Sequence, residues 1–321
     1  PAGSLDLLVI DEAGQFSLAN TLAVSRVAPR LLLLGDPQQL PSVGAGTVFS
    51  DITESVDDER HILHERYIRL DMVKRSRGEI PVFAENIRQG RLILPEEKSG
   101  IKDAARGNAD SAVFLMRPEL DTVLNLAVLK YKKLGEYAQQ DDIALLPDFL
   151  SQFVLLSPHN YGQWGTDNLN KKISEILSGG ERGFYPGMPV MILRNDYQND
   201  LFNGDRGIII SENSIFHAVF RDNHGRVRKV PAAMLKEWEV SYAQTIHKSQ
   251  GNEYDTAAVI LDKSAEKMLT NEILYTAVTR AKKEVLIFGE KEIIEAALKK
   301  KVVRCSGIDR SMINSATGLP E

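Results

Sequence analysis

The chain has 321 residues, of which 43% are hydrophobic and 26% are charged, and its formal net charge is −5. This composition is that of a globular protein with room for two or three domains, and it excludes a uniformly basic nucleic-acid binder, although not a local basic track. A single cysteine, Cys305, excludes an internal disulfide framework and a cysteine-rich metal site, and it suits a reducing cytoplasm. No apolar run reaches the roughly 18–20 residues of a membrane span, so we expect no membrane contact, and Pro1 begins no signal peptide.

The first part of the chain predicts two parallel strands joined by a helix. Apolar runs at 5–10 and 31–34 flank a helical stretch at 17–27, which is the pattern of a parallel α/β layer. The first strand ends in Asp11-Glu12 and the second in Gly35-Asp36. Because the carboxyl ends of parallel strands share the edge where such sheets place ligands, we expect these motifs to meet.

These strand ends carry the residue types that phosphoryl transfer needs. Mg²⁺ takes one or two carboxylates together with substrate phosphates, so Asp11 is the expected metal ligand. Glu12 is placed to orient the attacking water, and the Gln39 amide suits a γ-phosphate or that water. The alternative interpretations are surface acids at a strand end for Asp11-Glu12 and a polar turn for residues 35–39.

The middle of the chain predicts more helices and one buried strand. A charged hinge is expected at 57–69, followed by a helix at 69–90 with an apolar stripe that Gly90 closes. Residues 96–112 are polar and rich in Gly and Ala, which favours a mobile connection. A helix at 119–134, a strand at 153–157 and a turn with a helix over 161–177 follow.

Residues 184–240 have a different texture, with short strand-like runs separated by turn signals. The runs lie at 189–193, 207–210, 218–220 and 226–230. This spacing predicts a small β-barrel inserted into the α/β domain. Arg226 and Arg228 lie in a basic cluster with Arg221 and Lys229, which is interpreted either as a contact for single-stranded DNA or as a solvated basic turn.

The α/β pattern resumes at 241, with strands at 256–261 and 284–288, helices at 271–281 and 291–300, and a polar tail over 306–321. Arg280 lies on the otherwise apolar helix 271–281 and therefore calls for an anion, either a structural carboxylate or a nucleotide phosphate. A polar loop at 245–251 precedes the strand, and its short hydroxyls, amide and glycine allow close approach to phosphates or bases. His247 in this loop is alternatively a core histidine.

Taken in order, these motifs resemble superfamily 1 helicases, and most closely the RecD-like group that includes the alpha subunit of exodeoxyribonuclease V. The resemblance covers about residues 5–290. Its motifs are residues 11–15, 35–40, Arg75 with the stripe ending at Gly90, 169–170, 247–251 and 279–281, together with the especially RecD-like stretches 185–192, 194–196 and 201–205.

The resemblance implies an α/β fold with RecA-like parallel-sheet motor domains, of which the first (1A) is partial. The second (2A) is interrupted by a small SH3-like β-barrel (2B). The implied boundaries are 1–65 for the C-terminal part of domain 1A, 66–183 and 240–304 for domain 2A, 184–239 for domain 2B and 305–321 for a flexible tail.

The resemblance also implies an activity, namely ATP- and Mg²⁺-dependent translocation 5′→3′ on single-stranded DNA in recombination and repair. Carried over by motif, Asp11 and Glu12 form the Walker B pair, Gln39 is the sensor, and Arg75 and Arg280 contact the γ-phosphate. The residues expected to line the nucleotide are Gly35, Asp36, Gly251 and Glu253. Those expected in the loop that couples DNA to ATP are Thr245, His247, Lys248, Ser249 and Gln250.

Two departures from the family pattern open alternatives. The chain has no G-x-x-x-x-G-K-[ST] phosphate loop and no first DNA-contacting motif, so we expect both upstream of Pro1 and expect this chain alone to hydrolyse ATP poorly. One alternative is a nucleic-acid-binding or assembly module without ATPase activity, and another is an Upf1-like or Dna2-like helicase acting on RNA or DNA. No spaced acids of a nuclease are evident, so exonuclease activity would belong to partners, for which RecB-like and RecC-like subunits are implied.

Overall fold

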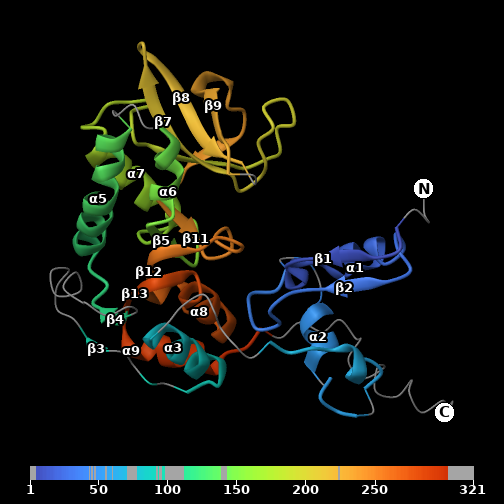
Figure 1. Cartoon of the computed structure of the whole chain (residues 1–321). Helices are drawn as coiled ribbons and strands as arrows, with labels where there is room; N and C mark the ends of the chain where they lie inside the picture. The colour runs from blue at the N-terminus through green and yellow to red at the C-terminus, as the bar shows by residue number, and fades with distance from the viewer. Residues whose placement is uncertain are drawn as a thin grey trace.

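The computed structural model describes residues 5–42, 44, 46, 48–54, 56–59, 61–70, 78–91, 93, 96–97, 112–138, 143–222 and 225–302. Arg75 and the tail at 305–321, about which the sequence makes predictions, lie outside the described residues. Figure 1 shows a first region (residues 5–70, blue) beside a second region (residues 78–302) built on a parallel sheet, with an antiparallel sheet at its upper end.

The parallel sheet of the second region has six strands in the order β11-β5-β12-β13-β4-β3. All neighbouring strands in it run parallel, and β12 lies at its centre between β5 and β13. Both β5 and most of β12 are buried apolar runs, as expected of strands covered on both faces. The strand bounds are β3 (Glu96–Glu97), β4 (Ala112–Met116), β5 (Phe153–Ser157), β11 (Ala243–Thr245), β12 (Tyr254–Leu261) and β13 (Ala281–Gly289).

Helices cover the two faces of this sheet and divide its core into two clusters. Along β12, Val259 and Leu261 pack with α3, α8 and α9, whereas Ala258 and Ile260 pack with α5 and α7. This alternation follows from the period of two along a strand. The helix bounds are α3 (Glu79–Arg88), α5 (Leu120–Tyr137), α6 (Leu146–Leu150), α7 (Thr166–Leu177), α8 (Asn271–Val278) and α9 (Lys291–Lys299).

Between β5 and β11 the chain forms a separate antiparallel sheet of five strands in the order β10-β6-β7-β8-β9. Its strands are β6 (Pro189–Ile192), β7 (Arg206–Glu212), β8 (Ile215–Arg221), β9 (Val227–Pro231) and β10 (Trp238–Val240). Since β5 and β11 are hydrogen-bonded neighbours, the antiparallel sheet interrupts the parallel one in sequence but not in space. Closure into an SH3-like barrel and the domain boundaries stay predictions.

The first region contains a two-stranded parallel sheet, β1 (Leu8–Ile10) and β2 (Leu31–Leu33). Its helices are α1 (Leu18–Val24), whose N-terminus is capped by the Ser17 hydroxyl, and α2 (Val48–Glu54). The predicted α/β fold class with its parallel sheet is confirmed. None of the helices in the described part of the chain is long and apolar enough to cross a membrane.

Three expectations need correction. Residues 96–97 of the connection predicted at 96–112 form β3, and residues 98–111 of it lie outside the described residues. The strand β4, which begins at Ala112 and pairs with β13, is missing from the sequence analysis. The helix predicted at 271–281 ends at Val278, so Arg280 lies after it and not on it. The loop predicted from 245 onward begins after a short strand, β11, in which Thr245 is the last residue.

Candidate active site

The acidic pair lies directly after β1, as predicted. Asp11 is exposed, and its Oδ1 accepts a hydrogen bond of 2.9 Å from the Glu12 amide. Glu12 has a left-handed backbone with φ 52° and ψ 43°, a conformation that costs a non-glycine residue about 1–2 kcal/mol. Such strained residues concentrate at functional sites, because the surrounding structure must hold them.

The second motif lies against the first. Backbone hydrogen bonds join Leu34 to Ile10 and Ala13 to Leu34, both at 2.8 Å, so the two strand ends stay paired. A Cβ on Gly35 would lie 3.2 Å from the Ala13 nitrogen and 3.2 Å from the Phe49 ring. Glycine is therefore the residue that allows this close approach between the two motifs.

The residues after Gly35 connect the first region to the second. Gln39 Oε1 accepts a hydrogen bond of 3.0 Å from Arg280 Nη2. The Leu40 amide donates to Thr276 Oγ1 at 2.9 Å, and the Leu40 carbonyl accepts from Gln250 Nε2 at 2.9 Å. Two motifs more than 200 residues apart in sequence thus converge on residues 39–40.

Arg280 is almost completely buried, with 1% of its surface exposed. Besides Gln39, its guanidinium donates to the carbonyl oxygens of Thr276 and Asn252, both at 3.2 Å. It lies in the turn between α8 and β13, where its own carbonyl accepts from the Tyr254 amide. The sequence predicts an anion as the partner of Arg280, but these three partners are neutral oxygens. They hold the guanidinium beside Gln39.

The loop at 245–251 is held by its own polar groups. Thr245 Oγ1 accepts from the Lys248 amide at 3.2 Å, and the buried Ser249 hydroxyl donates to the Ile246 carbonyl at 2.7 Å. Lys248 forms an ion pair of 2.6 Å with Glu239 of β10. His247 is half-buried, and Gln250 carries the contact to Leu40.

The two remaining residues predicted to line the nucleotide follow this loop. Gly251 is exposed and has a positive φ of 78°, which marks a turn that favours glycine. Glu253 lies 3.9 Å from Lys282 Nζ. The carbonyl oxygen of Asn252, between them, accepts a hydrogen bond from Arg280 Nη1, so the end of the loop lies against the converged residues.

Arg226 and Arg228 lie elsewhere, on or next to β9 of the antiparallel sheet. Arg226 pairs with Asp222 at 2.8 Å and Arg228 with Asp200 at 2.5 Å. The other two cations of the cluster also pair with acids, Arg221 with Asp148 and Lys229 with Glu212. The cluster is therefore largely neutralised by its own neighbours, and the structure does not bring it together with the site at residues 39–40.

Sequence reasoning missed the two α8 residues that reach the first region, Tyr275 and Thr276. The Tyr275 hydroxyl donates to Asp36 Oδ2 at 3.0 Å. Burial and the Asp36 carboxylate raise the pKa of Tyr275 well above its ordinary value, so the phenol stays protonated. Both residues stand a few positions before Arg280 in the motif at 275–281, and this closeness in sequence is the signal that could have pointed to them.

The described residues contain no cluster of three or more His, Cys, Asp or Glu side chains that would form a closed metal cage. Mg²⁺ bound with a nucleotide does not need one, because substrate phosphates and water supply most of its ligands. The exposed Asp11 carboxylate at the strand end has the hard oxygen donors that Mg²⁺ prefers, so the residues present fit such an ion.

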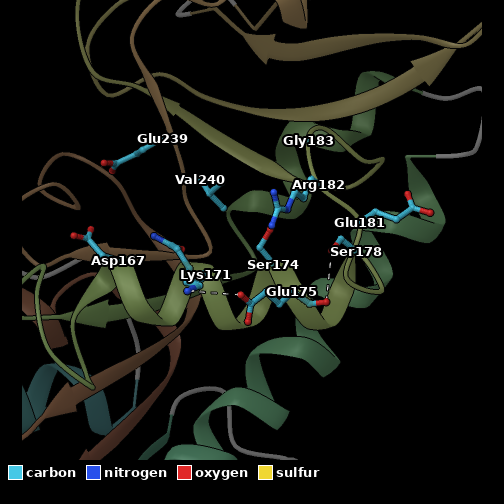
Figure 2. Close-up of a pocket in the computed structure, with 11 residues that line it drawn as sticks. Asp167, Lys171, Ser174, Glu175, Ser178, Glu181, Arg182, Gly183, Glu239 and Val240 are labelled. Atoms are coloured by element: carbon cyan, nitrogen blue, oxygen red, sulfur yellow. Dashed lines mark hydrogen bonds and ion pairs between the residues drawn. The ribbon is translucent and has the colours of Figure 1, made fainter.

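A separate groove of about 480 Å³ lies between α7, the loop that follows it and β10 (Figure 2). Acids outnumber bases along it: Asp167, Glu175, Glu181 and Glu239 against Lys171 and Arg182. Asn170, also in its lining, uses its side-chain amide to bond both the nitrogen and the oxygen of Ala243 at the outer edge of β11. This groove contains none of the residues predicted for the nucleotide.

Two protein families match this chain, one near each end of the described residues. Residues 240–288 match the UvrD-like helicase C-terminal domain, and residues 2–100 match an AAA domain. The first match spans the loop at 245–251, α8 and Arg280, and the second spans Asp11, Glu12 and Gln39. Gln39 and Arg280, which are hydrogen-bonded to each other, therefore lie in the matches to two different families.

The chain is also similar in sequence to proteins of the RecD group. The RecBCD enzyme subunit RecD of Mycolicibacterium smegmatis is 30% identical over 316 residues, which are 96% of this chain and 54% of that protein. The ATP-dependent RecD2 DNA helicase of Deinococcus radiodurans is 28% identical over 287 residues, covering 86% of this chain and 35% of that protein. The chain thus spans about half the length of the RecD relatives that it matches.

Among solved structures, a Pif1 helicase from Bacteroides, in complex with ADP-AlF3 and single-stranded DNA, superposes with a TM-score of 0.52. The superposition covers 98% of this chain and 76% of that one at 16% identity, so it speaks to the fold alone.

Proposed function

Because this chain belongs to the RecD-like superfamily 1 helicases, we propose that it is the part of an ATP-driven DNA motor in which the two motor domains meet. The observation that carries the proposal is the hydrogen bond between Gln39 of the first region and the buried Arg280 of the second. A phosphate-sensing amide and a cation for the developing charge are the groups that phosphoryl transfer needs side by side.

Each residue then has a role that its position supports. Asp11, exposed at the end of β1, holds Mg²⁺, and Glu12, fixed in a strained backbone beside it, orients the attacking water. Gln39 senses the terminal phosphate, and Arg280 contacts it. Arg75, which lies outside the described residues, is proposed to contact it on its motif alone. Bound Mg²⁺ and ATP would supply the reactive phosphate and neutralise part of its charge. Gly35, Asp36, Gly251 and Glu253 line the nucleotide.

The loop at 245–251 is proposed to couple DNA to this site. Gln250 at its end bonds the carbonyl of Leu40, the residue next to the sensor Gln39. A shift of the loop on binding DNA would therefore be transmitted to Leu40 through the Gln250 side chain. Thr245, His247, Lys248 and Ser249 are the candidates for contact with the strand, and the Lys248–Glu239 ion pair would open if Lys248 turned to a phosphate.

The wider assignments belong to the same proposal. The domain division is 1–65, 66–183 with 240–304, and 184–239, with translocation 5′→3′ on single-stranded DNA in the cytoplasm. RecB-like and RecC-like subunits are proposed as partners because relatives carry the name RecBCD enzyme subunit. Arg226 and Arg228 are proposed as peripheral DNA contacts that must first release Asp222 and Asp200.

ATP hydrolysis by the full-length gene product, measured with and without single-stranded DNA, tests the proposal. We expect turnover that DNA stimulates, and we expect Glu12→Gln to lower it at least ~100-fold, the scale of losing a group that orients the nucleophile. Glu136→Gln on the exposed side of α5 is the matched control and should leave turnover unchanged. Turnover that survives Glu12→Gln would contradict the role of Glu12, and DNA binding without any ATP hydrolysis would instead favour a binding module.

A further inference from the structure

A closed set of hydrogen bonds surrounds the Gln39 amide. Tyr275 donates to Asp36 Oδ2 at 3.0 Å, and Gln39 Nε2 donates to the same oxygen at 3.3 Å. The Gln39 carbonyl oxygen accepts from Arg280 at 3.0 Å. Because Tyr275 and Arg280 belong to α8 and the turn after it, the bonds run from the second region to the first and back again.

The chemistry of these groups fixes which way the amide points. An ionised carboxylate only accepts hydrogen bonds, and a guanidinium only donates them. Gln39 must therefore turn its NH₂ toward Asp36 and its oxygen toward Arg280. The opposite orientation would place two acceptors together at Asp36 and two donors together at Arg280. The direction of the Gln39 oxygen thus depends on where the Asp36 carboxylate lies.

Besides the bond from Gln39, two further hydrogen bonds hold the Asp36 carboxylate. Its Oδ1 accepts from the Gln38 amide at 3.0 Å, which is a local turn contact within the first region. Its Oδ2 accepts from Tyr275, the contact that comes from the second region. Removal of the Tyr275 hydroxyl would leave Asp36 tied only to its own loop, free to rotate about the Gln38 contact.

We propose that Tyr275 is a positioning residue for ATP hydrolysis, which acts through the Asp36 carboxylate to hold the Gln39 amide in the orientation that its sensing role requires. The proposal rests on the function proposed above. The helix α8 then contributes to the site twice, through Tyr275 on the helix and through Arg280 in the turn that follows it. Tyr275 itself need not touch the nucleotide.

The test measures kcat and KM for ATP in the full-length gene product at saturating single-stranded DNA. Tyr275→Phe keeps the ring and removes only the hydroxyl, and we expect kcat to fall about tenfold with KM within about twofold, the scale of one misplaced positioning contact. Tyr137→Phe is the matched control. That ring is also half-buried and stacks on Phe149 with 4.0 Å between the ring centroids, and none of the hydrogen bonds among the described residues involves its hydroxyl.

A double variant asks whether Tyr275 acts through Gln39. In a Gln39→Ala background, Tyr275→Phe should lower kcat no further. An equal loss of kcat in both backgrounds, or a Tyr275→Phe protein indistinguishable from Tyr137→Phe, would overturn the proposal. Hydrogen exchange at the Leu40 amide, which bonds Thr276 and not Tyr275, should stay at the unmodified rate, and a rate increase would assign the loss of kcat to a loosened interface.

The two proposals fail in different ways. If the unmodified protein hydrolyses ATP and Glu12→Gln abolishes the reaction, the motor assignment stands whatever Tyr275→Phe does. If the unmodified protein shows no turnover, the proposed function fails and the positioning role falls with it.

Discussion

The two regions of this protein differ in how completely their apolar side chains are buried. In the second region, Leu155, Val259 and Ile287 are completely buried in a six-stranded sheet covered on both faces. In the first region, the cluster of buried apolar side chains is Ile10, Ala13 and Phe49, and α1 has no buried residue. Several apolar residues of its two strands and their ends are nearly half-exposed, namely Leu5, Leu7, Val9, Leu32 and Leu34.

This difference matters because the acids and the sensor lie on the less buried region. A two-stranded sheet is marginal by itself, and within the described chain residues 36–40 are held partly by contacts with the second region. Polar contacts come from Tyr275, Thr276, Arg280 and Gln250, and the buried Leu40 side chain belongs to the same apolar cluster as Ile80 and Leu274 of the second region. Asp36 and the sensor Gln39 are therefore positioned by residues of both regions.

The largest expected effect contrasts the two cores directly. Phe288→Ala in β13, where the ring is completely buried, should lower the free energy of unfolding by about 3–5 kcal/mol. Leu32→Ala in β2, with 45% of the residue exposed, should cost about 1 kcal/mol or less. Urea denaturation followed by circular dichroism measures both values, and equal costs would remove the contrast between the regions.

The next effect concerns the arginine at the boundary. Arg280→Met keeps most of the side-chain volume but leaves the oxygens of Gln39, Thr276 and Asn252 without this donor, so we expect a loss of about 2–3 kcal/mol in unfolding free energy. Arg88→Met is the control, because Arg88 is 39% exposed and pairs with Glu85 on the surface of α3. Its loss should stay below about 1 kcal/mol. A similar loss in both variants would show that burial of Arg280 adds nothing.

A smaller effect is expected at the backbone contact between the regions. Thr276→Val removes the hydroxyl that accepts from the Leu40 amide and should cost about 1–2 kcal/mol. Hydrogen exchange at Leu40 should accelerate, since its amide loses the partner. Thr279→Val is the comparison, because the Thr279 hydroxyl donates to a carbonyl within the same segment, that of Thr276. Unchanged exchange at Leu40 in Thr276→Val would mean that this contact does not hold the regions together.

The smallest effect lies inside the second region and depends on pH. Burial raises the pKa of Glu284, whose Oε2 accepts from the Thr256 hydroxyl at 3.2 Å. Because the raised pKa favours the protonated form in the folded state, Glu284 contributes most at low pH, and that contribution is lost as the pH rises through its folded-state pKa. Glu284→Gln should therefore be the more stable protein near pH 7, by less than about 1 kcal/mol since the group is partly exposed.

The advantage of Glu284→Gln should shrink as the pH falls toward the ordinary glutamate value of about 4.3. Thermal denaturation at several pH values checks this, with Glu136→Gln on the exposed side of α5 as the control. An advantage that grows toward low pH would contradict the direction of the shift.

Much of this architecture could be predicted from sequence, because long apolar runs and a helical stripe are strong local signals. The strand at 153–157 is found as predicted, and the α3 stripe (Ile80, Phe83, Ala84 and Ile87) is buried. The strand β4 was missed because its apolar residues directly follow a polar, glycine-containing stretch, and only the pairing with β13 shows it to be part of the sheet.

The site was predictable in its residue types but not in its contacts. The motifs predict the chemical roles of four residues, namely Asp11, Glu12, Gln39 and Arg280. The partners of Arg280 could not be read from the sequence, because Asn252 and Thr276 contribute backbone oxygens, which any residue type would provide. Similarly, the pairing of Arg226 and Arg228 with acids depends on how the turns fold, and the sequence shows only the excess of positive charge.

The most direct test of the central claim, that both regions contribute to one nucleotide site, is hydrogen exchange of the full-length gene product with and without a non-hydrolysable ATP analogue and Mg²⁺. The account predicts slower exchange on binding in two places at once, at residues 11–14 and 35–40 of the first region and at residues 278–280 of the second. Slower exchange confined to one region, with the other unchanged at saturating analogue, would contradict it.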